Sequence, residues 1–374
     1  MMVTAESFAT LTVYLGVMVV SFLLAILYRN SIVKKELTSI VSDWIVRGLV
    51  ALPVSLLFGL RSLEVGWDTA SLVNVLFSSR YNLSSLLASQ HDPVFTFLSK
   101  SLFFIAPNNT FLYLFLLAFL TQFIFLSAVR RWENGRYLHT SYLTYLLYFA
   151  LIGMDQSRQM LAISIMLYGT VQLIEGKRKA FLIYVTIAGL FHFTAFFAYI
   201  FLIFKMKDKR HRVLKTLAIA SVVFVTVFPE ILFSQLGRFF GNTAYFEYFT
   251  GRYARLDGEE GGTGLRFVLD IIPCMAPLFF FRSLPKDSRW LIIISLLSTM
   301  PLRMLGYQSD FLYRIYYEPA IAIVFAYPYA FSYLSNKGRF FRCFMLILIL
   351  LVYFYISYST SHGIIPYESP YLVF

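Results

Sequence analysis

The chain has 374 residues, of which 59% are hydrophobic and only 14% are charged, with 40 Phe and 26 Tyr among the apolar residues. Soluble domains average about 45–50% apolar and about 25% charged residues, so a mean hydropathy of +0.69 excludes a soluble enzyme, a disordered protein and a disulfide scaffold. The formal net charge of +12 indicates membrane topology and not nucleic-acid binding, because the cytoplasmic loops of membrane proteins are rich in Lys and Arg.

Apolar segments that suit a bilayer recur along the whole chain, and a transmembrane helix needs about 20 such residues. The first, 8–28, has no basic start and no small-residue cleavage site, so we expect an uncleaved span. The other expected spans are 44–60, 110–129, 138–154, 159–175, 213–233, 265–281, 290–306, 311–331 and 340–358. The predicted fold class is all-α: one integral membrane domain over 1–374, folded as a polytopic transmembrane helical bundle of about 10–12 spans.

Six basic segments set the expected topology, namely 29–35, 130–136, 177–179, 205–215, 282–289 and 337–342. Placing all six in the cytoplasm makes the spans alternate and puts both termini outside. The exception is 180–204, because the 25 residues between Lys179 and Lys205 are too few for two full spans. We therefore expect a re-entrant pair of half-length helices that turns near His192, which is tolerated where the broken helix lines a cavity.

Arginine dominates the basic residues expected on the extracytoplasmic side. Nine of those ten residues are Arg, whereas the cytoplasmic set has 10 Lys and 12 Arg. The ten are Arg61, Arg80, Lys100, Arg158, Arg238, Arg252, Arg255, Arg266, Arg303 and Arg314. Because a planar guanidinium binds phosphate or carboxylate through two hydrogen bonds, this excess predicts an anion site. The alternative is that these arginines pair with local carboxylates such as Asp155, Asp270 and Asp310.

The first extracytoplasmic loop, 61–109, opens with Arg61, Glu64, Trp67 and Asp68. This turn places carboxylate, aromatic face and guanidinium together, which suits sugar binding. The alternatives are that Trp67 is an interfacial anchor and that Asp68 caps the next helix. Short apolar pieces at 71–88 and 93–106 are expected to lie in the interface. Between them, His91 beside Asp92 suits either a general base or a simple turn.

Two further residues are candidates for chemistry. Arg158 begins a predicted helix, where its charge adds to the positive end of the helix dipole and favours an oxyanion. A local pair between Asp155 and Arg158 is the alternative. His192, at the expected turn of the re-entrant pair, is either directed at a cavity or a hydrogen-bonded core residue.

The last candidates lie in the second half of the chain. The loop 234–264 interleaves Arg252, Tyr253 and Arg255 with Tyr and Gly, which suits a mobile cover over a ring-bearing substrate, although a solvated loop is the alternative. Arg314 and Glu318 are spaced i, i+4 on one helix face. Either they neutralise each other, or Glu318 holds Arg314 in place on an anion.

In this order, these segments resemble the EpsG/Wzy group of bacterial polysaccharide polymerases, from about residue 10 to residue 367. The matching pieces are Arg61–Asp68, Asp92–Phe95, Arg158–Ala162, Ala188–Ala195, Tyr245–Tyr253, Arg314–Tyr317 and Ile365–Tyr367. Two residues depart from the pattern. Trp67 stands where a small or hydroxylic residue is expected, and His91 stands where an acidic residue is common.

The resemblance implies a GT-C-like, metal-independent glycosyltransferase of the bacterial inner membrane, without a cofactor, whose active site faces the periplasm. Such enzymes join undecaprenyl-diphosphate-linked oligosaccharide repeat units into O-antigen or exopolysaccharide and release undecaprenyl diphosphate. Membrane lipid and a chain-length regulator are the other expected partners. An O-antigen ligase-like transferase and a flippase or anion transporter are the alternatives.

The resemblance also implies roles for residues. Arg158 and Arg314 would bind the diphosphate, with Arg61 or Arg266 assisting. Asp68 or His192 would deprotonate the acceptor hydroxyl. The expected substrate-binding set is Arg61, Glu64, Trp67, Arg252, Tyr253, Arg255, Arg266, Arg303 and Glu318.

Overall fold

The structure is a computed structural model that describes residues 5–36, 39–79, 82–85, 92–205, 216, 238, 264–306, 310–360 and 363–372. All regular elements in these ranges are helical and none is a strand, which confirms the all-α fold class. The chain divides into two compact units. Unit 1 comprises Met1–Val171, Thr186–Phe193 and Leu351–Phe374, and unit 2 comprises Gln172–Val185 and Thr194–Leu350.

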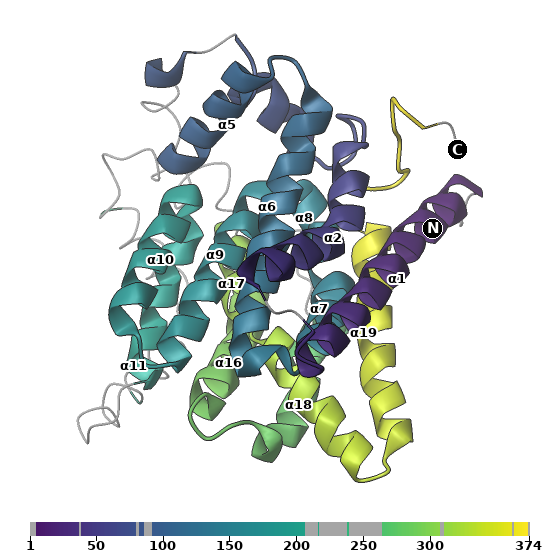
Figure 1. Ribbon diagram of the computed structural model, residues 1–374, viewed down its shortest axis with the longest axis vertical. Coiled ribbons are helices and arrows are strands. Elements are labelled where there is room, and N and C mark those ends of the chain that lie inside the picture. Colours follow the sequence, from purple (N-terminus) through teal and green to yellow (C-terminus); the bar gives the residue numbers. More distant parts are fainter. Residues whose placement is uncertain are drawn as a thin grey trace. The chain divides into compact units, whose positions relative to one another are not determined.

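Unit 1 is built from nearly all the helices of the first half of the chain (Figure 1). They are α1 (Ala5–Val33), α2 (Ile40–Gly59), α3 (Thr69–Ser71), the π-helix η1 (Leu72–Leu76), α5 (Pro93–Ile105), α6 (Thr110–Arg131), the 3-10 helix η2 (Trp132–Gly135), α7 (Leu138–Tyr148), α8 (Ala150–Asp155) and α9 (Ser157–Ile174). Helix α2 packs along both α1 and α6, and α7 packs against α1.

Unit 2 contains the 3-10 helix η3 (Phe193–Ile200), α11 (Phe201–Lys205), α15 (Leu265–Met275), the 3-10 helix η4 (Ala276–Ser283), α16 (Arg289–Gly306), α17 (Asp310–Ala320) and α18 (Ile323–Asn336). Helices α10 (Arg178–Phe191) and α19 (Phe340–Thr360) contribute residues to both units, as do the end of α9 and the first residue of η3. Within unit 2, α16 packs against α15 and α17, and α18 packs against η4.

Three helices among the described residues are long and apolar enough to cross a bilayer: Ser7–Val33, Ile40–Gly59 and Thr110–Gly135. They coincide with the first, second and third of the long predicted spans. Shorter apolar helices are Pro93–Ile105, Phe193–Ile203 and Phe340–Ile356. The total of 10–12 spans and the GT-C likeness stay predictions, and the predicted span 213–233 lies outside the described residues except for Thr216.

Two of the other predicted spans are interrupted helices. The segment 138–154 breaks between α7 and α8 at Phe149, and 311–331 breaks between α17 and α18 at Ile321. The second break follows Pro319, which cannot donate a helical hydrogen bond. Hydropathy alone does not show such breaks, because a broken helix keeps its apolar composition.

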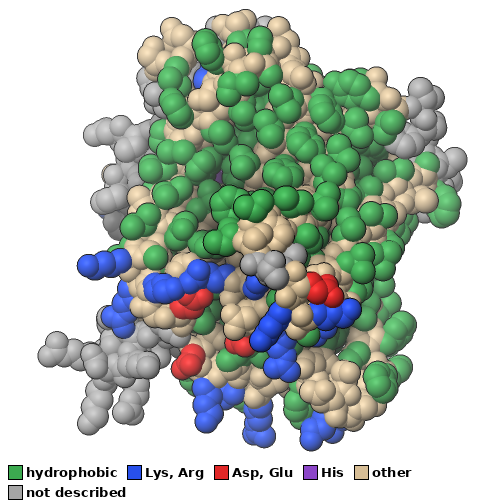
Figure 2. All heavy atoms as spheres, in the orientation of Figure 1, with side chains coloured by type: hydrophobic (Ala, Val, Ile, Leu, Met, Phe, Trp, Pro, Cys, Tyr) green, Lys and Arg blue, Asp and Glu red, His purple; other side chains and the backbone are tan. Residues whose placement is uncertain are grey.

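The outer surface of α1 and α2 is apolar, with large side chains such as Leu23, Leu27 and Ile45 more than half exposed. Figure 2 shows the same feature over much of the visible face, where hydrophobic side chains predominate. Contiguous apolar surface of this extent marks contact with a membrane or a partner. Together with the apolar helices, it supports a membrane protein.

The chain turns at His192, where the sequence predicts a turn. Helix α10 ends at Phe191, and the chain continues as η3. The returning segment lies against α10, since the Tyr199 hydroxyl donates to the Leu182 carbonyl at 3.3 Å. The depth of this hairpin in a membrane stays a prediction.

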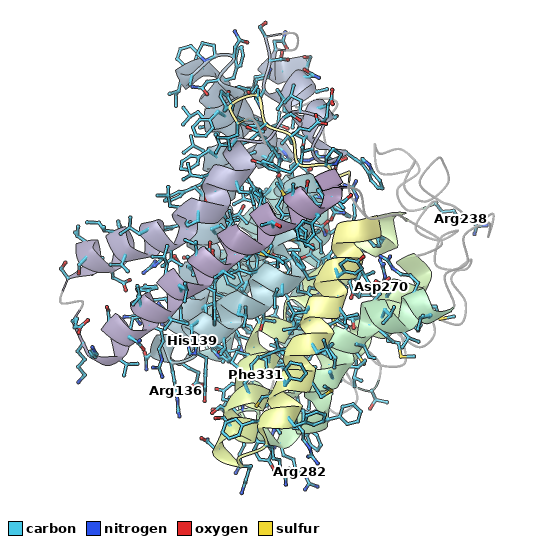
Figure 3. All side chains as sticks on the ribbon, turned by 90° about the vertical axis from the view of Figure 1, so that its right-hand side faces the viewer. Arg136, His139, Arg238, Asp270, Arg282 and Phe331 are labelled. Atoms are coloured by element: carbon cyan, nitrogen blue, oxygen red, sulfur yellow. The ribbon has the colours of Figure 1, made fainter. Side chains whose placement is uncertain are left out.

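Two predicted cytoplasmic segments meet at one end of unit 1. Arg29 Nε donates to the Arg136 carbonyl at 3.3 Å, and Figure 3 labels Arg136 there. Nearby, Asp43 accepts hydrogen bonds from Arg47 and from Arg130 Nε, the latter at 3.1 Å. The carboxylate thus neutralises two guanidinium groups that the apolar helices α2 and α6 carry, as charges of low exposure require.

This cluster gives a first testable prediction. Asp43→Ala is expected to lower the free energy of unfolding by about 3 kcal/mol, because it leaves the largely buried Arg47 charge without its carboxylate. Thermal unfolding of the purified protein in detergent measures the change. Glu36→Ala is the control, since it breaks an exposed ion pair with Lys34 that is worth less than about 1 kcal/mol. Equal melting temperatures for the two variants would contradict the prediction.

Candidate functional site

The candidate site lies in unit 1 just beyond the C-terminal end of α2. Two backbone hydrogen bonds of 2.8 Å join this segment to the C-terminal tail: Ser62 N–H to the Glu368 carbonyl, and Gly66 N–H to the Gly363 carbonyl. A third contact, from Asp68 N–H to Asp155 Oδ1 at 2.9 Å, ties the turn to the junction of α8 and α9. Three segments far apart in the sequence therefore meet here.

Gly66 makes the turn possible. Its φ of +92° lies in the region that only glycine adopts readily. A Cβ at this position would lie 2.8 Å from Thr69 Oγ1 and 3.0 Å from the Met154 carbonyl oxygen. Both the backbone conformation and the close packing therefore require glycine. The positions of Trp67 and Asp68, which follow in the turn, depend on this residue.

Arg61, which lies beyond the span Ile40–Gly59, is buried with only 3% of its surface exposed. Its Nη2 lies 3.5 Å from the Ser157 hydroxyl, and its Cζ lies 5.3 Å from the centre of the Phe58 ring. Its Nε and Nη1 are buried and have no hydrogen-bond partner among the described residues. The guanidinium therefore keeps unused donors in a place of low dielectric.

Burial lowers the pKa of Arg61 to about 10, and the nearby negative charge of Asp155 opposes this effect. A pKa of about 10 still leaves the group almost entirely protonated at neutral pH. A buried cation with unused donors is costly unless an anion compensates it. The Arg61 side chain is thus suited to receive an anionic oxygen.

Arg158 lies in the first turn of α9 and reaches across to Asp92, with Nη1 3.2 Å from Oδ2. The sequence offers Asp155 as a local partner of Arg158, and the structure adds Asp92, from a distant segment. The other oxygen of Asp92 accepts a hydrogen bond of 3.3 Å from the Phe193 backbone N–H. The buried Asp92 therefore connects three segments: the start of α5, the start of α9 and the turn after His192.

We call Arg61, Asp68, Asp92, Asp155 and Arg158 the arginine site. Ser157 links its two arginines, because it contacts Arg61 and precedes Arg158 in the chain. Arg158 stands in the first turn of α9, where the positive end of a helix dipole lies. The arginine site thus combines two guanidinium groups with a helix N-terminus, an arrangement that favours phosphate oxygens.

The other predicted site residues of unit 1 surround this site. Asp68 is half-buried at the N-cap position of α3, yet its side chain makes no capping hydrogen bond, so the predicted cap is wrong. Glu64 is exposed. Trp67 is 71% exposed, and its ring lies so close to Gly363 that a Cβ there would be 2.5 Å from Cδ1. His192 is buried, and its backbone N–H donates to the Ala188 carbonyl.

Two arginines of unit 2 that the sequence predicts to bind substrate, Arg266 and Arg303, share the carboxylate of Asp270. Arg266 Nε lies 3.1 Å from Asp270 Oδ2, and Arg303 Nε lies 3.0 Å from the same oxygen. Figure 3 labels Asp270. Arg303 also stacks on Tyr313, with its Cζ 4.6 Å from the ring centre. Local pairing, the alternative that the sequence leaves open, describes both arginines, and their substrate role stays a prediction.

Glu318, also in unit 2, accepts a hydrogen bond of 2.6 Å from the Thr194 hydroxyl. Arg314 is half-exposed, and its role on the diphosphate stays a prediction. Arg80, His91, Arg252, Tyr253 and Arg255 lie outside the described residues, as does nearly all of the loop 234–264.

The sequence indicates Asp92 only together with His91, as a general base or a turn, and not as the partner of Arg158. Its place before Pro93 marks a helix start, which explains its presence without a function. It lies 66 residues from Arg158 in the chain, so no local pattern connects the two. Both residues also occur in the pieces that resemble the polymerases.

Comparison with known proteins identifies one relationship. The model of the EpsG family matches residues 44–369, which include the whole arginine site. No curated protein and no solved structure matches the chain. The family match confirms the resemblance and indicates a polysaccharide polymerase of the membrane.

The Gly66 turn yields a second testable prediction. Gly66→Ala is expected to destabilise the protein by about 1–2 kcal/mol, because alanine is strained at positive φ and its Cβ would collide with Thr69 and Met154. Gly16→Ala is the matched control, since no atom within 4 Å would meet a Cβ there and alanine favours the helix. Melting temperatures in detergent test this pair. A Gly66→Ala protein as stable as the Gly16→Ala protein would refute the account of the turn.

Proposed function

The chain belongs to the EpsG family, and we propose that it joins undecaprenyl-diphosphate-linked oligosaccharide repeat units into a surface polysaccharide. A hydroxyl of one repeat unit attacks the anomeric carbon of the reducing-end sugar of another. A glycosidic bond forms, the bond from the sugar to the diphosphate oxygen breaks, and undecaprenyl diphosphate leaves with the bonding electron pair. Fixed cations at the departing oxygen lower the barrier to such a step.

The observation that carries this proposal is the Arg61 guanidinium. It is buried, it is protonated at neutral pH, and its Nε and Nη1 have no hydrogen-bond partner among the described residues. A structural arginine in an apolar protein is normally paired with a carboxylate, as Arg47 is with Asp43. The unused donors of Arg61 instead suit the oxygens of a diphosphate.

Arg158 complements Arg61 in this role. Its side chain is 26% exposed, so it is the arginine that an incoming diphosphate reaches first. Asp92 holds it at the start of α9 without enclosing it. The C-terminal tail lies beside this position, since Glu368 and Gly363 accept the backbone hydrogen bonds of Ser62 and Gly66.

Asp68 is our choice for the base that takes the proton of the acceptor hydroxyl. It is half-buried on the Gly66 turn, so a substrate hydroxyl can approach its carboxylate, whereas His192 is buried. Its backbone N–H is held by Asp155, which fixes the position of the turn. A general base must lie within hydrogen-bond reach of the proton that it abstracts, and this exposure favours Asp68.

The contacts of α1 support an extracytoplasmic position for the arginine site. In the first half of α1, the Tyr14 hydroxyl donates to the Ile364 carbonyl at 2.6 Å, in the tail that also contacts Gly66. Near the end of α1, Arg29 contacts the basic segment at Arg136. Tyr14 and Arg29 are about 22 Å apart along a helix. If the basic end is cytoplasmic, the arginine site lies toward the outer face of the inner membrane.

A deletion strain tests the reaction class. We expect loss of the long polysaccharide with single repeat units still made and exported, because only the joining step is missing. Mass spectrometry of the surface glycans and of the lipid-linked pool measures both species. Polymer that is made but not attached would instead indicate a ligase, and repeat units trapped in the cytoplasm would indicate a flippase.

The arginines provide a sharper test. Arg61→Met and Arg158→Ala are each expected to reduce polymerisation at least about 100-fold, because each removes a donor to the leaving group. The assay is polymerisation of the native lipid-linked repeat unit by the purified protein. Arg136→Ala, at the basic end of unit 1, is the control and should polymerise normally. Normal chain length in an Arg61 or Arg158 variant would remove that residue from the proposal.

A further inference from the structure

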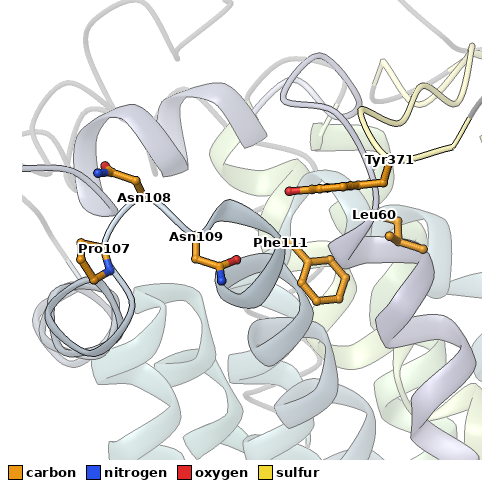
Figure 4. A pocket seen from close by; sticks show the side chains of 6 residues that line it. All are labelled: Leu60, Pro107, Asn108, Asn109, Phe111 and Tyr371. Atoms are coloured by element: carbon orange, nitrogen blue, oxygen red, sulfur yellow. The ribbon is translucent and has the colours of Figure 1, made fainter.

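A pocket of about 540 Å³ opens in unit 1 next to the arginine site (Figure 4). Its size falls within the range of small-molecule sites, about 300–1,000 Å³. The lining residues come from the end of α2, the turn between α5 and α6 and the C-terminal tail: Leu60, Pro107, Asn108, Asn109, Phe111 and Tyr371. Because these segments are distant in the sequence, no local pattern indicates the pocket.

The lining is neutral, polar and aromatic. None of the described lining residues carries a charge. Tyr371 is 55% exposed, and its ring meets the Phe111 ring edge to face, with centroids 5.9 Å apart. In Figure 4 the hydroxyl of Tyr371 points toward the side of the pocket where the asparagines lie. The pocket therefore offers a ring and hydrogen-bonding groups to the same ligand.

The two asparagines are held in defined positions. Asn109 Oδ1 accepts a hydrogen bond of 2.9 Å from the Leu112 backbone N–H and so caps α6, which orients the amide group of Asn109. Asn108 has a φ of +61°, a conformation that asparagine tolerates better than most residues, and its side chain is exposed. Both amides are thus presented at the pocket by the local backbone.

We propose that this pocket binds an uncharged sugar residue of the glycan, an inference that rests on the proposed function. Sugars offer hydroxyl groups to amides and apolar C–H faces to aromatic rings, and the pocket provides partners for both. A phosphate would require a cation, which the described lining does not supply. A prenyl chain would bury the amides without hydrogen bonds, which is costly.

The position of the pocket fits a substrate in which sugar and diphosphate are covalently joined. Leu60 lines the pocket and Arg61 follows it directly, so their Cα atoms are about 3.8 Å apart. The same tail that carries Tyr371 also contacts Gly66 through Gly363. In this proposal one ligand has its charged group at the arginine site and its glycan at the neutral pocket.

Binding to two probes tests the proposal. The probes are the native lipid-linked repeat unit and undecaprenyl diphosphate without sugar, each titrated against the purified full-length protein in nanodiscs. Asn108→Ala and Tyr371→Leu should each weaken binding of the repeat unit about three- to tenfold, the effect of one neutral hydrogen bond. Binding of undecaprenyl diphosphate should not change.

Two matched variants serve as controls. Asn134→Ala replaces another exposed asparagine of positive φ, on η2, and Tyr355→Leu replaces another half-exposed tyrosine, on α19. Both should bind the two probes as the unaltered protein does. Purified protein and melting temperatures establish that each variant is folded.

The outcomes separate this inference from the proposed function. The pocket proposal is overturned if both pocket variants bind the repeat unit as the unaltered protein does. It is also overturned if the variants bind both probes equally more weakly. If the pocket variants bind only the repeat unit more weakly, and the unaltered protein binds the repeat unit without polymerising it, the pocket proposal holds and the polymerase proposal fails. Binding of neither probe by the unaltered protein overturns both.

Discussion

The cost of charge inside an apolar helical protein is the constraint on which this structure depends. A guanidinium cannot lose its proton under ordinary conditions, so each buried arginine must find compensation in the fold or in a ligand. Asp43 compensates Arg47 in unit 1, and Asp270 compensates Arg303 in unit 2. Among the described residues, Arg61 instead contacts a hydroxyl and an aromatic ring and has Asp155 nearby, while its Nε and Nη1 make no hydrogen bond. This difference separates arginines that maintain the fold from the one that we assign to substrate.

Arg158, which Asp92 holds, is intermediate between the paired arginines Arg47 and Arg303 and the buried Arg61. Asp92 pairs with Arg158, but it also accepts the Phe193 N–H, so its charge is divided between a guanidinium and the backbone. An arginine held by one oxygen keeps donors for an incoming anion, whereas Arg303 directs both its Nε and its Nη2 to Asp270. The geometry of the partner, and not its mere presence, decides whether an arginine remains available for binding.

The arginine site and the neutral pocket divide the recognition of one substrate. A diphosphate requires fixed positive charge, whereas a fixed charge adds little binding free energy when the ligand is a neutral sugar. Amides and aromatic rings discriminate among hydroxyl patterns, because a mismatched hydroxyl leaves a polar group unpaired. On this interpretation, Arg61 and Arg158 serve any lipid-linked donor, whereas Asn108 and Tyr371 are where a preference for particular sugars arises.

The sequence by itself determined the helical membrane class and the end of a helix just before His192. These features follow from composition, charge and segment length, which act locally along the chain. Only the tertiary structure decided that Arg158 pairs with Asp92 and that Arg61 is buried. Ion pairing and burial depend on which distant segments pack together, and no local pattern encodes a contact across 66 residues.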